Sequence, residues 1–314
     1  MDKLRVAIPI AAYEPGTTGE YAARAFRQLG HEATILSQWQ FYDAFRKDEY
    51  DLYFCVDSGG PLNLFEMNIL NGPWRKLAFW MIDYRRGKTL KNPNDFDTCK
   101  FVSGLGGWVF QANYEDFVDC MNNGILRCSW LPLAADPDVW SGPGFTPPDQ
   151  RPYDVAFVGN VWDGARQQAL EDIKRSGLQL AWFGHGAVYM EAGAEVLRQA
   201  RLGFNISSFY GEPVAYDVNM RVFETLACGI PLVTNFVPSL NRLFGDPLPP
   251  FVVVYHQFDQ IVPVIRRALW DGTAEWGSAA RYWAVELGTY KLRAEQALAT
   301  LKDQAKAPMG MRVL

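Results

Sequence analysis

The residues with the clearest chemical potential lie between 219 and 235, where a short helical pattern runs into a short apolar strand pattern. Asp217 or Asn219 can cap the helix, and Arg221 and Glu224 share a polar face. A helix N-terminus attracts anions, arginine is a forked donor for phosphate, and a carboxylate one turn further in can bind a ribose diol. This combination fits a nucleoside diphosphate. A solvated ladder of Asp217, Arg221 and Glu224 explains the same spacing.

Strand and helix patterns alternate along both halves of the chain, which predicts parallel sheets covered on both faces. Helical patterns include 21–29, 114–121, 165–175 and 190–198. The predicted strands are 6–10, 33–36, 52–56, 77–82 and 108–110 in the first half, and 154–158, 178–183, 202–206, 232–234 and 251–255 in the second.

A proline-rich segment, 132–152, separates the two series and has the composition of a linker. We therefore predict two α/β domains, at 1–140 and 153–287, with a cleft at the carboxyl ends of their strands. A long helical pattern runs from Ser278 to about Lys306, and Gly288 interrupts it with a kink or a break.

Composition excludes several classes of protein. The chain has 314 residues, 49% of them hydrophobic, and a net charge of −5, so its overall charge does not favour a nucleic-acid binder, although a local basic patch stays open. Five cysteines without a Cys-x-x-Cys pair and three histidines without metal-site spacing predict free thiols in a reducing cytosol and no bound metal. No apolar run approaches the roughly 20 residues of a membrane-spanning helix, so we expect a cytoplasmic protein.

The order of motifs in the second half resembles the CgeB-type glycosyltransferases, a branch of the group 1 sugar transferases. The resemblance covers roughly residues 130–300, and weaker matches lie at 77–83 and 131–136. Two departures are Gly288, where the family commonly has histidine, and Tyr216, where related retaining enzymes often have glutamate, with Asp217 beside it. The motifs that carry the resemblance are Asp154–Asn160 with Arg166, Trp182–Gly186, Leu202–Ser207, Asn219–Glu224 with Ala227–Gly229, and Thr289–Tyr290 with Arg293.

This resemblance implies the GT-B fold: two Rossmann-type domains facing a central cleft, with a C-terminal helix, about 288–314, that packs back on the first domain. It implies a transferase that moves a sugar from a nucleoside-diphosphate sugar to an acceptor, with retention of the anomeric configuration. In this fold, helix N-termini and basic side chains generally stabilise the leaving diphosphate. We therefore expect no cofactor and no essential metal ion.

Within that framework the donor-binding residues can be assigned. Arg221 pairs with the diphosphate, Glu224 holds the ribose hydroxyls, and Asn219 fixes the loop or contacts phosphate. Arg166 reaches the phosphates or is a surface charge. The other candidates are Gly159 and Asn160 at a strand end, His185 near the nucleobase or as a packing residue, Asn205 in the cleft or bonded to backbone groups, and Gly16 and Thr17 in a loop near the donor phosphates or the acceptor.

The first half is expected to hold the acceptor. Asp83 ends an apolar strand and is the candidate for acceptor binding or general-base catalysis, with a structural cap as the alternative. A polymer, a protein, a modified nucleic acid and a metabolite all stay open as acceptors, and the oligomeric state stays open too. The alternatives to a transferase are a sugar-nucleotide epimerase of the same architecture and a non-catalytic nucleotide- or sugar-binding module.

Overall fold

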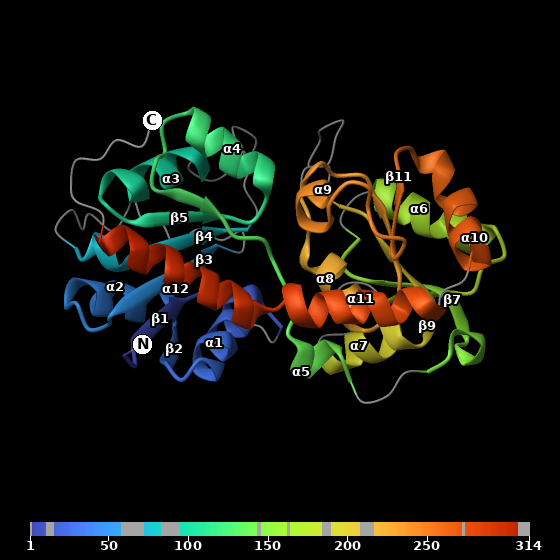
Figure 1. The fold of residues 1–314 in the computed structure, drawn as a ribbon, viewed down its shortest axis with the longest axis horizontal. Coiled ribbons are helices and arrows are strands. Elements are labelled where there is room, and N and C mark those ends of the chain that lie inside the picture. Colours follow the sequence, from blue (N-terminus) through green and yellow to red (C-terminus); the bar gives the residue numbers. More distant parts are fainter. Residues whose placement is uncertain are drawn as a thin grey trace. The chain divides into compact units, whose positions relative to one another are not determined.

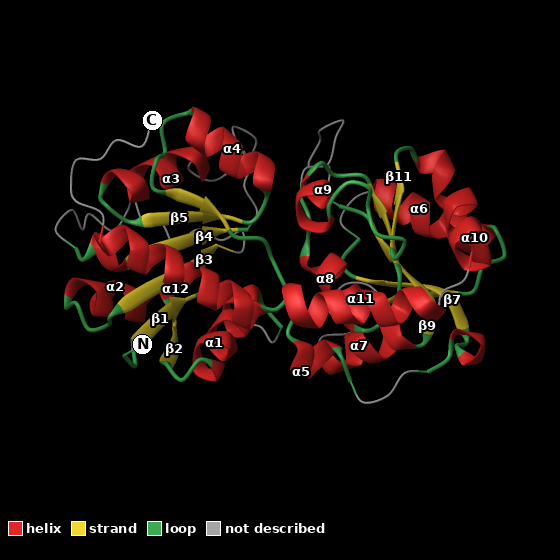
Figure 2. Cartoon of the chain, in the orientation of Figure 1, coloured by secondary structure: helices red, strands yellow, loops and turns green. Residues whose placement is uncertain are grey.

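The chain folds into two compact units: unit 1 comprises Met1–Pro132 and Tyr290–Leu314, and unit 2 comprises Leu133–Thr289. Each unit is built around one sheet (Figures 1 and 2). The computed structural model describes residues 2–10, 16–57, 72–82, 95–142, 146–161, 164–183, 190–207, 217–271 and 274–306.

Unit 1 contains a six-stranded parallel sheet in the order β2-β1-β3-β4-β5-β6. The central strand β4 is buried along its whole length, as expected for a parallel sheet covered on both faces. The strands are β1 (Arg5–Pro9), β2 (Glu32–Leu36), β3 (Leu52–Asp57), β4 (Leu77–Met81), β5 (Trp108–Gln111) and β6 (Cys128–Trp130). The helices are α1 (Thr18–Gln28), α2 (Gln38–Arg46), η1 (Trp74–Lys76), α3 (Asp95–Gly104), α4 (Tyr114–Asn122) and α12 (Tyr290–Lys306).

Unit 2 contains a five-stranded parallel sheet in the order β11-β10-β9-β7-β8. Its strands are β7 (Tyr153–Val158), β8 (Leu180–Phe183), β9 (Ala200–Asn205), β10 (Leu232–Asn235) and β11 (Val252–Tyr255). Its helices are α5 (Pro137–Trp140), η2 (Pro148–Gln150), α6 (Gly164–Arg175), α7 (Met190–Arg198), α8 (Met220–Ala227), α9 (Ser239–Phe244), η3 (Phe258–Gln260), α10 (Ile261–Asp271) and α11 (Ala274–Leu287). The two parallel sheets confirm the predicted fold class.

The proline-rich segment 132–152 contains α5 and η2, and α5 packs against α7 and α8 within unit 2. The predicted C-terminal helix is broken at Gly288: α11 ends at Leu287 and α12 begins at Tyr290. The cause is visible in the backbone, because the Gly288 carbonyl accepts a hydrogen bond from the Ala135 amide at 2.8 Å and Thr289 forms a bridge with Ala135. This pairing takes the Gly288 carbonyl out of the helical pattern.

Helix α12 packs along α1 in unit 1 (Figure 1). Tyr290, in its first turn, is 3% exposed and stacks on Tyr21 with 5.1 Å between ring centroids. Its ring also lies 6.1 Å from that of Trp80 on β4. An aromatic side chain from the end of the chain thereby completes the core of the first sheet.

We predict that Tyr290→Ala lowers the free energy of unfolding by about 3 kcal/mol, because truncating a buried aromatic residue removes its contacts and leaves a cavity. The matched control is Tyr282→Ala on α11, where the side chain is 71% exposed and the expected change is within about 0.5 kcal/mol. Urea denaturation followed by tryptophan fluorescence measures both. Equal denaturation midpoints for the two variants would contradict this packing role.

Candidate functional site

The candidate site lies where the strand order of unit 2 reverses. From β7 the chain passes to β8 on one side, and it then returns to β9 on the other side of β7. Ligands of open α/β sheets bind at such a topological switch point, outside the carboxyl ends of the strands. Here those ends are Val158 of β7 and Asn205 of β9, and the predicted donor residues Gly159 and Asn160 follow directly after β7.

Arg221 extends from the first turn of α8 to the carboxyl end of β7. Its Nε donates a hydrogen bond to the Val158 carbonyl, and its guanidinium carbon lies 6.0 Å from the centre of the Phe157 ring. Gly159 makes this position accessible, because a Cβ atom at Gly159 would collide with the guanidinium group. The absence of a side chain at residue 159 therefore admits a cation from 62 residues further along the chain.

Arg166, on α6, is 8% exposed and bridges the two strand ends of the switch point. Its Nη1 donates to the Asn160 carbonyl at 3.1 Å and its Nη2 to the Ile206 carbonyl at 3.0 Å. Burial is the main cause that lowers the pKa of Arg221; the nearby Glu224 raises this pKa, and Arg166 lowers it by repulsion to a smaller extent. The predicted alternative of a surface charge is therefore wrong for Arg166. Two guanidinium groups share one edge of the sheet.

Glu224 is 6% exposed, one turn after Arg221 on α8. Burial raises the pKa of its carboxyl group to about 7, and the nearby Arg221 counteracts this only in part. Among the described residues, no hydrogen bond or ion pair within 4.0 Å joins Glu224 to a partner side chain. A solvated salt-bridge ladder therefore does not describe this face of α8, since its carboxylate is buried and not paired directly with Arg221.

Two asparagines add polar atoms to the same edge. Asn205 is fully buried at the end of β9, where its Nδ2 donates to Thr234 Oγ1 at 3.0 Å. Asn219 occupies the N-cap position of α8, as predicted, but its side chain makes no capping hydrogen bond. In the described part of the chain, the Oδ1 atoms of Asn205 and Asn219 are buried and lack a hydrogen-bond partner.

The structure brings seven of the predicted residues into unit 2 near the switch point: Gly159, Asn160, Arg166, Asn205, Asn219, Arg221 and Glu224. Gly16 and Thr17 belong to unit 1, at the start of α1, where the Gly16 amide donates to Glu20 Oε2 at 2.8 Å. Asp83 and His185 lie outside the described residues.

Three residues that shape this edge were not among the predicted site residues. Phe157 lies beneath the Arg221 guanidinium, and Thr234 accepts from Asn205. Asn235 Oδ1 accepts from the Ser207 amide at 2.8 Å and so ties together the segments that follow β9 and β10. A polar Thr-Asn pair at the end of an apolar strand was the available signal for Thr234 and Asn235. Phe157 has no such signal, because it is one apolar residue in an apolar strand.

Other features of the described residues bear on the class of site. They contain no group of three or more histidine, cysteine, aspartate or glutamate side chains placed to hold a metal ion. The five cysteines are buried and free. None of the described helices is both long enough and apolar enough to cross a membrane.

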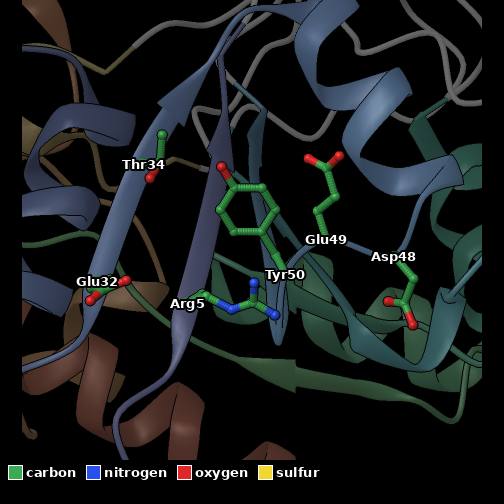
Figure 3. A pocket seen from close by; sticks show the side chains of 6 residues that line it. All are labelled: Arg5, Glu32, Thr34, Asp48, Glu49 and Tyr50. Atoms are coloured by element: carbon green, nitrogen blue, oxygen red, sulfur yellow. The ribbon is translucent and has the colours of Figure 1, made fainter.

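A hollow of about 410 Å³ lies in unit 1, at the edge of its sheet where the strands begin (Figure 3). It opens beside the first residues of β1 and β2 and the segment after α2. Its acidic side chains have nearby cations: Glu32 pairs with Lys3 and Asp48 with Lys76, both at 2.7 Å. With its charges paired and its place at the amino ends of the strands, this hollow is not favoured as the functional site. It is lined by Arg5, Glu32, Thr34, Asp48, Glu49 and Tyr50.

Comparison with known proteins gives a consistent classification. Residues 149–299 match a family model described as "Glycosyl transferase-like". None of the curated proteins matches the chain. Among solved structures, AviGT4, a glycosyltransferase involved in avilamycin A biosynthesis, has a TM-score of 0.66 at 16% identity, and the match covers 97% of this chain and 99% of that one.

Two further structures are similar over nearly the whole chain. HepE from Anabaena, in complex with UDP-glucose, has a TM-score of 0.61 at 13% identity, with 96% of this chain and 100% of that one covered. Sucrose-phosphate synthase from Thermosynechococcus elongatus has a TM-score of 0.63 at 12% identity, with 96% and 99% covered. At these identities the likeness shows the fold, and it is the GT-B fold of two parallel-sheet α/β domains.

We predict that Gly159→Ala displaces the Arg221 guanidinium and lowers the affinity for inorganic pyrophosphate on the order of tenfold or more, because a charge-assisted contact to phosphate is lost. Gly164→Ala, at the first residue of α6, is the matched control, since no atom lies within 4 Å of the added Cβ. Isothermal titration calorimetry with inorganic pyrophosphate measures both variants. Equal affinities would contradict a role for the Gly159–Arg221 contact in ligand binding.

We also predict an unusual pH dependence of stability. Glu224 has a pKa of about 7 when folded, against an ordinary value of 4.5, so the folded protein keeps a proton that the unfolded chain releases between these two values. The free energy of unfolding therefore falls as the pH rises from about 4.5 to about 7, and Glu224→Gln removes this loss. The stability of the variant relative to the native protein should grow by about 3 kcal/mol across that window. A difference that stays constant in urea denaturation from pH 4.5 to pH 8 would contradict the burial of an unpaired carboxyl group.

Proposed function

We propose that this protein is a glycosyltransferase that moves a sugar from a nucleoside-diphosphate sugar to an acceptor. The observation that carries the proposal is the convergence of Arg166 and Arg221 at the switch point of unit 2, beside the buried carboxyl group of Glu224. Arg166 is buried and Arg221 is partly buried, and the two guanidinium groups repel each other, so an anion placed between them or against them stabilises both. A diphosphate supplies that anion.

The same groups fit the chemistry of sugar transfer. When the glycosidic bond breaks, negative charge develops on the departing diphosphate, and preorganised donors stabilise it most effectively in a site away from water. The guanidinium group of Arg221 is held in place by the Val158 carbonyl before any ligand binds. Its remaining N–H groups and the start of α8 are the donors we assign to the diphosphate.

Glu224 is assigned to the ribose of the donor. A buried carboxylate is stabilised when hydrogen bonds satisfy its oxygens, and the vicinal hydroxyl groups of a ribose provide two donors at adjacent positions. Because Glu224 lies one turn after Arg221 on α8, we assign to it the sugar of the nucleoside that is next to the phosphates. Asn205 and Asn219, with their unpartnered oxygens, are assigned to the surroundings of the same ligand.

The comparisons support this assignment. The "Glycosyl transferase-like" match covers the segment that contains every one of these residues. HepE, which shares the fold, is described in complex with UDP-glucose. We extend the proposal to a CgeB-type, retaining, metal-independent and cytoplasmic enzyme of the hexosyltransferase type, with Asp83 as the acceptor-binding residue or general base. The acceptor is a polymer, a protein, a modified nucleic acid or a metabolite.

We predict that the protein binds at least one of UDP, GDP, ADP, CDP and TDP, and that Arg221→Ala weakens this binding at least tenfold, as expected for loss of a charge-assisted hydrogen bond. The matched control is Arg267→Ala on α10, where the arginine side chain is 84% exposed. A ligand that binds the folded state raises the melting temperature, so thermal-shift screening identifies the nucleotide and calorimetry measures the variants.

The corresponding sugar nucleotide then tests catalysis. Transfer or slow hydrolysis should release the nucleoside diphosphate, continue in the presence of EDTA, and give a first product with the donor's anomeric configuration in proton NMR. Conversion of the sugar nucleotide to an epimer without any acceptor would instead establish an epimerase. Absence of binding to all five diphosphates would overturn the proposal.

A further inference from the structure

The last residue of β8, Phe183, lies directly beside the diphosphate site assigned above. Strand β8 is the edge strand next to β7, and Phe183 is in register with Val158. The Gly159 amide donates to the Phe183 carbonyl at 3.2 Å. The aromatic side chain therefore stands at the carboxyl edge of the sheet, one strand away from the carbonyl group that holds Arg221.

The ring of Phe183 differs from the core aromatic rings of this sheet, as does that of Trp182 before it, which is 37% exposed. Phe157, Phe204 and Tyr255 are at most 2% exposed and pack against one another in the core. Phe183 is 39% exposed, and no ring contact joins it to another aromatic residue in the described part of the chain. A large apolar surface is thus left open at the edge of the sheet where ligands bind.

We propose that Phe183 is the surface on which the nucleobase of the sugar donor stacks. This inference rests on the proposed function. Neighbouring strands lie about 4.8 Å apart, and in a nucleoside diphosphate the ribose separates the base from the phosphates. With the diphosphate at the end of β7, the base reaches a position one or two strands away. Every base has a π-face, so stacking on an aromatic ring is available whichever nucleobase the donor carries.

The opposite side of the switch point is less suited to this role. There β9 ends in Asn205, which is fully buried. The next aromatic residue is Phe236, after β10, and its ring already lies 5.2 Å from that of His256. Phe183 is closer to Gly159 and its ring has no aromatic neighbour among the described residues.

The test compares two probes, UDP and inorganic pyrophosphate, in calorimetric titrations of the full-length protein. Phe183→Ala should weaken UDP binding on the order of tenfold, the effect expected when a stacked base loses its aromatic partner, and should leave pyrophosphate binding unchanged. Phe183→Tyr keeps the aromatic face and should restore UDP binding. Trp182→Ala is the matched control, because Trp182 is 37% exposed, precedes Phe183 in β8 and projects to the other face of the sheet. Phe236→Ala is the control for the opposite side of the switch point, where Phe236 follows β10.

The outcomes are distinguishable. If the native protein binds UDP and Phe183→Ala binds it equally well, the stacking role is wrong and the proposed function stands. Equal losses of UDP and pyrophosphate binding in Phe183→Ala would also overturn it, since that pattern reports a distorted site. A selective loss of UDP binding in Trp182→Ala or Phe236→Ala, with Phe183→Ala unaffected, would show that the base stacks on that residue and not on Phe183. If the native protein binds neither UDP nor any other nucleoside diphosphate, the proposed function itself fails.

Discussion

The hydrogen bond from the Arg221 side chain to the Val158 carbonyl is the contact on which the whole candidate site depends. A parallel strand that ends at a switch point leaves its last carbonyl groups without a strand partner, and here an arginine from a later helix takes one of them. Only a glycine at residue 159 leaves room for the guanidinium group. Helix α8 is thereby fixed with its N-terminus at the edge of the sheet, and Glu224 follows one turn behind.

Burial, rather than an imbalance of charge, makes this edge costly without a ligand, because Arg221 is attracted to Glu224 and Asp217 as well as repelled by Arg166. Arg166 and Arg221 repel each other, and burial lowers the pKa of Arg221 while raising that of Glu224. A buried carboxyl group without a direct partner and buried amide oxygens without donors each cost free energy. A folded protein tolerates such costs at a functional site because the remainder of the structure supplies the stability. A nucleoside diphosphate satisfies both kinds of group, because its anionic oxygens accept from the arginines and its hydroxyl groups donate to the carboxylate and the amide oxygens.

Much of this arrangement was predictable from the sequence, because it depends on local patterns. The alternation of strand and helix signals predicts both parallel sheets, and the spacing of Asn219, Arg221 and Glu224 places them in the first turns of one helix. The bounds of α2 were not predicted although a signal for its start is present: Ser37 and Gln40 form a reciprocal capping box. Two contacts cannot be predicted from the sequence. One is the contact between Gly159 and Arg221, and the other is the pair of hydrogen bonds that Arg166 donates to the Asn160 and Ile206 carbonyls. Both depend on how strands distant in sequence are ordered in the sheet, and no local pattern encodes that order.

A crystal structure of the protein soaked with UDP tests the central claim most directly. We predict density for the diphosphate against the Arg221 guanidinium and the start of α8, with the ribose hydroxyl groups within hydrogen-bond distance of the Glu224 carboxylate. Density for UDP bound elsewhere, with the end of β7 unchanged and Glu224 without a ligand contact, would contradict it.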